Sequence, residues 1–421
     1  MKVLKAELTP VAFADPPLLN MMGVHEPFAL RGVLRLACED GVVGLGESYG
    51  DKGFLDVVRK VAAALPGHDV FDLPGLQRLV AATVADTVYM DQHGLTGAFS
   101  QDKTLAQVYS MFEVASLDAQ GHTLGRPVVD LLGGRARDRV DFSAYLFYKF
   151  GAHADGREDA WGEVLTPESI VDEARTMVDR YGFGSIKLKG GALPPEQEIA
   201  AVRALAEAFP GAPLRIDPNG AWQVDTALRV ADELDGVLEY LEDPTPGIEG
   251  MARVAEHANM PLATNMCVVR FADLPPAVRA GSKGAVGIVL SDHHFWGGLR
   301  LTQSLSVLCE TFGLGLSMHS NSHLGISLAA MVHVAAATPH LTYACDTHWP
   351  WKSEDVIVPG ALEFHQGAVA VPDGPGLGVE LDEDALARAH ENYLRCGLTA
   401  RDDATYMRRF EPSFQPNLSR W

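Results

Sequence analysis

Polar side chains recur at the ends of short apolar runs in the middle of the sequence. They are Asp217, Glu242, Asn265, Asp292 and His319, and the successive intervals are 25, 23, 27 and 27 residues. Each interval fits one strand and one helix of a repeating β/α unit. Catalytic groups gather at the carboxyl ends of the strands in a parallel barrel. We therefore expect these five side chains to share one site.

Asp217, Glu242 and Asn265 place oxygen donors on three consecutive strand ends. Hard oxygen ligands suit Mg²⁺ and leave positions for water or substrate, without any thiolate or imidazole. Each residue alone would more simply be the N-cap of the helix that follows its strand. Three such residues in register favour a Mg²⁺ site instead.

Two lysines precede this set on the second expected strand. Lys187 and Lys189 are two residues apart, so both side chains point to one face of the strand. Neighbouring ammonium groups lower each other's affinity for a proton, and a lysine perturbed in this way can act as a base near neutral pH. Two surface lysines on an edge strand are the simpler alternative. The Gly190-Gly191 pair and the helical patterns on either side favour the barrel interior.

His319 ends the seventh expected strand and Asp292 ends the sixth. A carboxylate beside the imidazole would orient it and favour its charged form. A satisfied core histidine is the usual alternative, and we expect that role for His293, His294 and His323. A zinc hydrolase on a barrel would need H-x-H after the first strand, where this sequence reads Y-L-F-Y.

Apolar runs of strand length predict an α/β fold with a (β/α)7β-type, TIM-like barrel over residues 135–370. The expected strands are Phe142–Phe147, Ser185–Leu188, Leu214–Ile216, Val237–Leu241, Leu262–Thr264, Gly287–Leu290, Gly315–Met318 and Leu341–Ala344. Amphipathic helical patterns lie between them. One of these helices has Thr166 as its N-cap, Pro167 in its first turn and Gly182 after its end. This alternation implies a parallel sheet with helices outside.

The two ends of the chain follow other patterns. Strands are expected at Val3–Phe13, Leu30–Cys38 and Val42–Glu47. Mostly helical patterns follow them, so residues 1–134 are predicted to form an α+β capping domain. Residues 371–421 hold one helical pattern around Glu383–Tyr393, which is too little for a separate domain. We expect this C-terminal segment to pack on the capping domain.

The composition excludes several classes of partner. The chain has 421 residues, 47% of them apolar, which is enough for a large buried core. Its 55 acidic and 34 basic residues give a net charge of −21, which disfavours nucleic acid and anionic membranes. No apolar stretch approaches the roughly 20 residues that span a bilayer, and the N-terminus is charged where a secretory signal would be apolar. Five scattered cysteines indicate a reduced, cytoplasmic protein.

The polar residues together resemble the mandelate racemase-like group of the enolase superfamily, whose sites use a Lys or His base with Mg²⁺. Within that group the sequence is most similar to the glucarate dehydratase family. The shared motifs are DPPLLN (15–20), WGEVLTPE (161–168), KLKGG (187–191), DPNGAW (217–222), EDP (242–244), ATNM (263–266), DHHFW (292–296), HSNSH (319–323), DTHW (346–349), PGLGVE (375–380) and ARDDA (400–404).

This resemblance implies roles for individual residues. The implied Mg²⁺ ligands are Asp217, Glu242 and Asn265, and the implied catalytic residues are Lys189 with Lys187 and Asn219 beside it, and His319 with Asp292. The implied substrate contacts are Asn20, His25, Tyr145, Phe147, Ser320, Asn321, His348 and Arg401. Departures from the family pattern occur at Ala98, at Ser48-Tyr49 and at Gly297-Gly298-Leu299, near the expected substrate end.

The implied activity is that of a lyase that removes the proton α to a carboxylate and eliminates the β-hydroxyl. The implied substrates are D-glucarate and L-idarate, with 5-keto-4-deoxy-glucarate as the product. A dehydratase or epimerase of another acid sugar, such as galactarate, is an alternative, because a shared fold and site do not settle the substrate. A catalytically silent binding relative is another, against which the complete set of bases and ligands argues. The expected partners are a small dicarboxylic acid sugar and further copies of the chain in a homo-oligomer.

Overall fold

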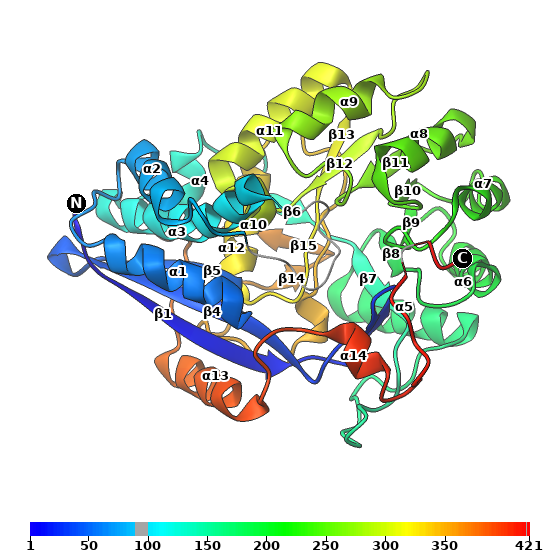
Figure 1. Ribbon diagram of the computed structural model, residues 1–421, viewed down its shortest axis with the longest axis horizontal. Helices are drawn as coiled ribbons and strands as arrows, with labels where there is room; N and C mark the ends of the chain where they lie inside the picture. The colour runs from blue at the N-terminus through cyan, green and yellow to red at the C-terminus, as the bar shows by residue number, and fades with distance from the viewer. Residues whose placement is uncertain (89–99, 418) are drawn as a thin grey trace.

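A curled parallel sheet forms the centre of the computed structural model, which describes residues 1–88, 100–417 and 419–421 (Figure 1). Its strands are β7 (Ala144–Phe147), β8 (Ile186–Lys189), β9 (Leu214–Asp217), β10 (Tyr240–Glu242), β11 (Leu262–Thr264), β12 (Ile288–Ser291) and β13 (Gly315–Met318). Each strand pairs with the next one along the chain. The first seven strands of the predicted barrel are thereby confirmed.

The eighth expected strand, Leu341–Ala344, does not form a regular strand. The backbone N–H groups of Thr342 and Tyr343 both donate to the carbonyl of Leu316, at 3.0 and 3.2 Å. The evenly spaced hydrogen bonds of a parallel strand pair therefore do not form here. The segment still joins the two edges of the sheet. The carbonyl of Cys345 accepts a hydrogen bond from Ser143 on the β7 side, and Asp346 N–H donates to Met318 at the end of β13.

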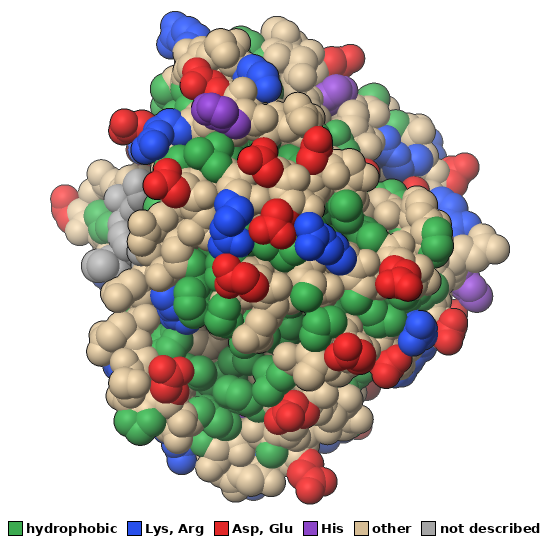
Figure 2. Space-filling model, turned by 90° about the vertical axis from the view of Figure 1, so that its right-hand side faces the viewer, with side chains coloured by type: hydrophobic (Ala, Val, Ile, Leu, Met, Phe, Trp, Pro, Cys, Tyr) green, Lys and Arg blue, Asp and Glu red, His purple; other side chains and the backbone are tan. Residues whose placement is uncertain are grey.

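Helices cover the outside of this sheet, as the alternating pattern predicts. They are α5 (Pro167–Tyr181), α6 (Pro195–Ala208), α7 (Val224–Glu233), α8 (Gly247–His257), α9 (Leu274–Arg279), α11 (Leu299–Phe312) and α12 (Gly325–Ala336), whereas the short α10 (His293–Trp296) packs on α3 (Gln101–Leu124). Thr166 caps α5 by accepting from Ser169 N–H, and Gly182 ends it in the left-handed conformation, which confirms both expectations. Figure 2, viewed from the side of α6 and α7, shows acidic and basic side chains interspersed on this outer face.

The N-terminal residues form a three-stranded antiparallel sheet with helices on it, as predicted, and we call this layer the cap. Its elements are β1 (Val3–Ala14), β4 (Phe28–Cys38), β5 (Val43–Tyr49), α1 (Lys52–Ala64), α2 (Leu73–Thr83), α3 (Gln101–Leu124) and α4 (Val128–Leu131), with a hairpin of β2 (Leu19–Asn20) and β3 (Gly23–Val24). Helix α3 packs directly against β5. The two elements are so close that a Cβ atom at Gly44 would stand 2.0 Å from the Ala115 carbonyl oxygen.

The C-terminal segment returns to the cap over most of its length. Just before this segment, β15 (Ala368–Ala370) pairs with β14 (Phe364–His365) and with β6 (Arg139–Asp141). Within the segment, α13 (Glu383–Cys396) packs on β1 of the cap. Helix α14 (Asp403–Met407) lies beside β3. The last residues depart from the expectation, because Trp421 N–H donates to the Ala221 carbonyl after β9, on the barrel. Among the described helices, none is long and apolar enough to cross a membrane.

Arg215 on β9 ties the closing segment of the barrel together. Its side chain is buried, and Nη1 donates to Ser143 Oγ at 2.9 Å and to the Ala344 carbonyl at 2.8 Å. Its Nε donates to Glu239 at 2.6 Å. The Arg215 guanidinium therefore bonds both the residue before β7 and the irregular segment 341–346, where regular strand pairing is lacking.

Replacing Arg215 with Met is expected to lower the free energy of unfolding by about 3 kcal/mol, because it leaves Glu239 and the Ala344 carbonyl without their donor. Urea denaturation measures the change. Arg175→Met is the control, since Arg175 forms an exposed pair with Asp172 at 2.9 Å and should cost at most about 1 kcal/mol. Equal losses in the two variants would contradict the role of Arg215 in closure.

Candidate active site

A cavity of about 820 Å³ opens where the carboxyl ends of the barrel strands meet the cap. Twelve of the sixteen residues expected from the sequence line it, namely Asn20, His25, Tyr145, Phe147, Lys189, Asn219, Asn265, His319, Ser320, Asn321, His348 and Arg401. The remaining four, Lys187, Asp217, Glu242 and Asp292, lie behind this lining. The structure therefore gathers all of the expected residues at one place.

Lys187 lies in a fully buried cluster of carboxylates. Its Nζ is 2.7 Å from Glu242 Oε2, 2.7 Å from Asp346 Oδ2 and 3.7 Å from Asp217 Oδ2. Burial by itself would lower the pKa of Lys187, but the carboxylates of Asp346 and Glu242 outweigh it and raise the pKa well above the ordinary value. The expectation of a lowered pKa is thus wrong for Lys187, because its nearest charges are negative. It holds the cluster together and does not line the cavity.

Lys189 faces the cavity from the same strand. Parallel pairing of β8 with β9 sets Lys189 opposite Asp217, and Nζ donates to Asp217 Oδ2 at 2.6 Å and to Asn219 Oδ1 at 2.8 Å. Asn219 takes a left-handed backbone conformation, φ 51°, which Asn tolerates better than most residues. Its backbone N–H donates to Asp217 Oδ1 at 2.9 Å. This turn brings the Asn219 amide back to the lysine.

The oxygen donors beside Lys189 suit a hard divalent cation. Carboxylate oxygens of Asp217, Glu242 and Asp243 lie within 4.8 Å of one another. Burial and the nearby Asp217 raise the pKa of Glu242 well above its usual range and that of Asp243 to about 7. Excess negative charge of this kind is what a bound cation relieves. Asn265 donates to Glu242 Oε1 at 3.0 Å, so its amide would have to turn to offer oxygen.

His319 lies on the other side of the cavity and is paired as expected. Its Nδ1 is 3.1 Å from Asp292 Oδ2, which leaves Nε2 as the nitrogen that can exchange a proton with a bound molecule. Burial opposes ionisation of Asp292, but His294 and His319 outweigh it and hold the pKa of that carboxyl well below its usual range. His293, His294 and His323 are buried, as predicted for structural histidines.

Residues from the cap and the C-terminal segment close the outer end of the cavity. Arg401 donates to Asp403 through Nε and Nη2, both at 2.6 Å, and Asn20 Nδ2 donates to the same carboxylate at 3.0 Å. His25 Nδ1 lies 3.0 Å from Asp15 Oδ2. The Asp403 carboxylate thus fixes the positions of two side chains that face the cavity, Asn20 and Arg401, which come from opposite ends of the chain.

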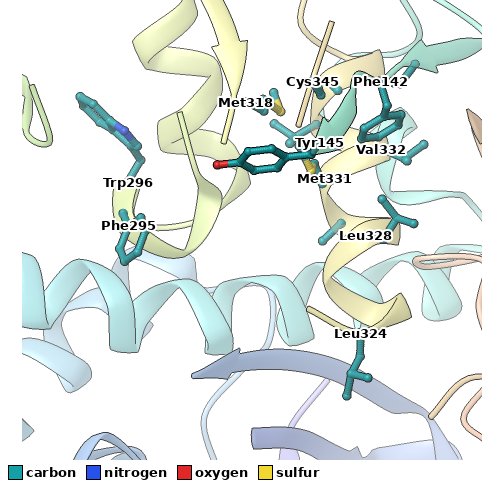
Figure 3. Close-up of a cluster of buried hydrophobic side chains, with 14 of the residues drawn as sticks. Phe142, Tyr145, Phe295, Trp296, Met318, Leu324, Leu328, Met331, Val332 and Cys345 are labelled. Atoms are coloured by element: carbon teal, nitrogen blue, oxygen red, sulfur yellow. The ribbon is translucent and has the colours of Figure 1, made fainter. Parts of the chain in front are cut away.

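Aromatic rings form one wall of the cavity. The ring centroids of Tyr145 and Phe147 are 4.7 Å apart, and His348 meets Tyr145 at 5.0 Å. Figure 3 shows Tyr145 among Met318 and Cys345, with its hydroxyl pointing away from Phe142. Burial lowers the pKa of His348 well below its usual range, so this imidazole is neutral. Its Nδ1 is 3.2 Å from Ser320 Oγ.

Sequence reasoning missed two residues of this site, Asp346 and Arg31, and identified a third, Tyr49, only as a departure from the family pattern. Asp346 follows the expected eighth strand, and that position could have identified it. Arg31 and Tyr49 line the cavity from β4 and β5 of the cap, and Tyr49 hydroxyl contacts the amide of Asn321. No sequence signal connects them to residues almost 300 positions away. The departure at Ser48-Tyr49 therefore does reach the cavity.

The departure at Gly297-Gly298-Leu299 does not reach the cavity lining. Gly297 and Gly298 form the turn between α10 and α11, where a Cβ atom at Gly298 would stand 2.2 Å from Glu113. This turn lies outside the cavity lining. Ala98 lies outside the described residues.

Two segments of the chain match known domain families. Residues 9–133 match the mandelate racemase / muconate lactonizing enzyme N-terminal domain. Residues 169–385 match the enolase C-terminal domain-like family. The two matches cover the cap and most of the barrel.

Relatives and solved structures resemble the whole chain. A probable glucarate dehydratase of Streptomyces coelicolor is 53% identical over 431 residues, covering 100% of this chain and 99% of the relative. An enolase structure from Thermobispora bispora, complexed with magnesium and formate, has a TM-score of 0.98 at 58% identity and covers 100% of both chains. Another from Pseudomonas fluorescens, with bound magnesium, potassium and tartrate, has a TM-score of 0.96 at 50% identity, covering 100% of this chain and 99% of that one.

Magnesium is expected to stabilise the fold through the carboxylates behind the cavity. A single-site ligand at about a hundred times its dissociation constant raises the free energy of unfolding by about 2.7 kcal/mol. We expect the matching upward shift of Tm in the unaltered protein and its loss in Asp217→Asn. Glu113→Gln, at a buried carboxyl that accepts Leu299 N–H at 2.8 Å between α3 and α11, is the control and should keep the shift. An undiminished shift in Asp217→Asn would contradict this site.

Proposed function

The chain belongs to the enolase superfamily, in the branch of mandelate racemase and muconate lactonizing enzyme, and from this premise we propose that it is a dehydratase of acid sugars. The substrates are D-glucarate and L-idarate, and the product of both is 5-keto-4-deoxy-glucarate. The superfamily uses Mg²⁺, and solved relatives of this chain hold that ion.

One observation carries the proposal: Lys189 and His319 both line a cavity beside a cluster of oxygen donors. A base must come within hydrogen-bonding distance of the proton that it removes. Two bases from separate strands, β8 and the end of β13, can serve opposite faces of one bound carbon atom. The carboxylates of Asp217 and Glu242, with Asn265, would hold Mg²⁺ next to Lys189.

Proton transfer at His319 would begin the reaction of D-glucarate. When bound, Mg²⁺ supplies electrophilic stabilisation of the negative charge that develops at the substrate carboxylate. His319 Nε2 takes the proton α to that carboxylate, and Asp292 stabilises the resulting imidazolium. The imidazolium then returns a proton to the β-hydroxyl, which leaves as water. The remaining enol tautomerises to the keto acid, so all atoms are accounted for.

Lys189 would serve the other face of the same carbon atom. Its ammonium group bonds Asp217 and Asn219, and the amine left after loss of a proton could remove the α-proton of the epimer, L-idarate. An epimerase that interconverts the two acids without losing water would use the same two bases, so release of water decides between these activities.

The lining of the cavity suits a substrate with two carboxylates. Lys189 and Arg401 bring N–H donors to the cavity, each held by a buried carboxylate, Asp217 or Asp403. Asn20 and His25 add hydrogen-bonding groups for hydroxyls at the outer end. The 53% identity to a probable glucarate dehydratase supports this choice, as does tartrate, a hydroxylated dicarboxylate, in a solved relative.

Substitution of each base is expected to remove the reaction of one epimer and to leave proton exchange of the other. His319→Gln should lose dehydration of D-glucarate by at least about a hundredfold, because general-base catalysis from that face is removed. Lys189 should still exchange the α-proton of L-idarate with solvent deuterium. Lys189→Arg should show the reverse pattern. NMR of both acids in D₂O reads label position and keto-acid formation together.

The outcome that would withdraw the two-base assignment is equal loss of exchange for both epimers in either variant. Release of no keto acid by the unaltered enzyme, with exchange intact, would indicate an epimerase.

Asp403 is expected to affect substrate binding more than chemistry. Asp403→Asn loses one acceptor for Arg401 and Asn20, which should raise KM for D-glucarate about tenfold with little change in kcat. Steady-state kinetics measures both constants. Asp402→Asn is the matched control, since Asp402 is exposed and caps α14 by accepting Thr405 N–H at 2.9 Å. A kcat loss as large as the KM change would contradict a pure binding role.

A further inference from the structure

The cap reaches the His319–Asp292 pair through a second histidine. Asp292 Oδ1 lies 2.7 Å from His294 Nδ1 and accepts His294 backbone N–H at 2.9 Å, while Oδ2 lies 3.1 Å from His319 Nδ1. Arg31, from β4 of the cap, places Nη2 3.1 Å from His294 Nε2. Arg31, Asp292 and His294 are all buried. A continuous series of contacts thus connects the cap to the base on β13.

The donors and acceptors in this series favour one state of His294. In the alternative state, Nε2 carries a proton and donates it to Ser327 Oγ at 2.9 Å, which leaves Arg31 Nη2 facing an N–H at 3.1 Å. A guanidinium has only N–H donors, so His294 Nε2 accepts from Arg31 and carries no proton. A carboxylate accepts, so Nδ1 carries the proton and donates it to Asp292. Ser327 fits the same state, because its Oγ accepts from Arg31 Nη2 at 3.3 Å and can donate to His294 Nε2 at 2.9 Å. These contacts favour the neutral form of His294, with its proton on Nδ1.

Arg31 is held in this position by Glu47. The antiparallel register of β4 and β5 makes the two residues diagonal neighbours on one face of the cap sheet, and Arg31 Nε donates to Glu47 Oε1 at 2.8 Å. Glu47 also accepts Leu324 N–H at 2.9 Å and Ser327 N–H at 2.8 Å, at the start of α12. Burial would raise the pKa of Glu47, but Arg31 and these N–H groups outweigh it and hold the pKa at about 2.

We propose that Arg31 is a positioning residue that keeps His294 in the neutral Nδ1–H form and so reserves the negative charge of Asp292 for His319. A second imidazolium on Asp292 would compete with the one that forms on His319 when it takes the substrate proton. Other titratable groups around His294 are His293 beside it, Tyr49 of β5 with its ring centroid 5.7 Å away, His323 from the loop after β13, and Glu47 behind Arg31. The consequence for His319 rests on the proposed function, whereas the state of His294 does not.

The state of His294 can be measured directly by ¹⁵N NMR of protein labelled in its histidine rings, with His294→Gln identifying the signals. We expect the Nδ1–H form in the unaltered protein. In Arg31→Lys the single ammonium keeps its charge beside Glu47 but cannot also reach His294, so Nε2 loses its donor and should carry a proton. Ser327→Ala, which keeps the Arg31 contact, is the matched control and should retain the Nδ1–H form.

Two results of this measurement would overturn the proposal. One is an Nε2–H form of His294 in the unaltered protein, which needs no variant to be observed. The other is an unchanged Nδ1–H form in folded Arg31→Lys.

Kinetics of Arg31→Lys tests whether Arg31 keeps the negative charge of Asp292 available to His319. We expect kcat for D-glucarate to fall on the order of tenfold, because the His319 base loses part of its support. Exchange of the L-idarate α-proton by Lys189 in D₂O should fall clearly less than dehydration of D-glucarate, since that face does not use Asp292, whereas a loss of substrate binding would lower both. Equal losses of D-glucarate dehydration and of L-idarate proton exchange would overturn the claim that Arg31 acts through Asp292. Absence of turnover in the unaltered protein would refute the proposed function and leave the NMR result to decide the state of His294.

Discussion

Buried carboxylates hold the polar groups that face the cavity, and the arrangement of the site depends on these contacts. The pairs are Asp217 with Lys189, Asp292 with His319, Asp15 with His25, Asp403 with Arg401 and Asn20, and Glu47 with Arg31. An unpaired charge in such surroundings costs several kcal/mol, so each partner is confined to the position that satisfies its carboxylate. The cavity-facing atoms are thereby oriented before any substrate arrives, as catalysis by fixed charges requires.

The same argument explains the cluster beneath Lys189. Four carboxylates, Asp217, Glu242, Asp243 and Asp346, lie around the two ammonium groups of Lys187 and Lys189. If all of them ionise, the excess equals the charge of one divalent cation. Lys187 keeps this group of like charges together from within the barrel. In the proposed site, Lys189 and Mg²⁺ would then share Asp217 behind the cavity lining without leaving an uncompensated charge.

Sequence periodicity predicted the parts of the structure that repeat. Strand spacing located β7 to β13, and the polar residues after those strands do meet at one end of the barrel. The closing segment 341–346 could not be predicted as irregular, since its apolar pattern is that of a strand and the crowding at the Leu316 carbonyl is tertiary. The charge environment of Lys187 was also hidden, because Asp346 lies 159 residues away. Arg31 follows no motif and reaches the site only through the pairing of β4 with β5.

The division of labour between barrel and cap follows from these contacts. Both proposed bases and the oxygen donors come from barrel strands, whereas Asn20, His25 and Arg401 come from the two ends of the chain. Changes in the cap could therefore alter the fit of the substrate while leaving the bases in place. Arg31 limits that freedom, because it belongs to the cap and yet contacts His294 behind the Asp292 carboxylate. The cap thus helps to position His319 after β13. The pairing register of β4 with β5 must be kept, because it places Arg31 beside His294.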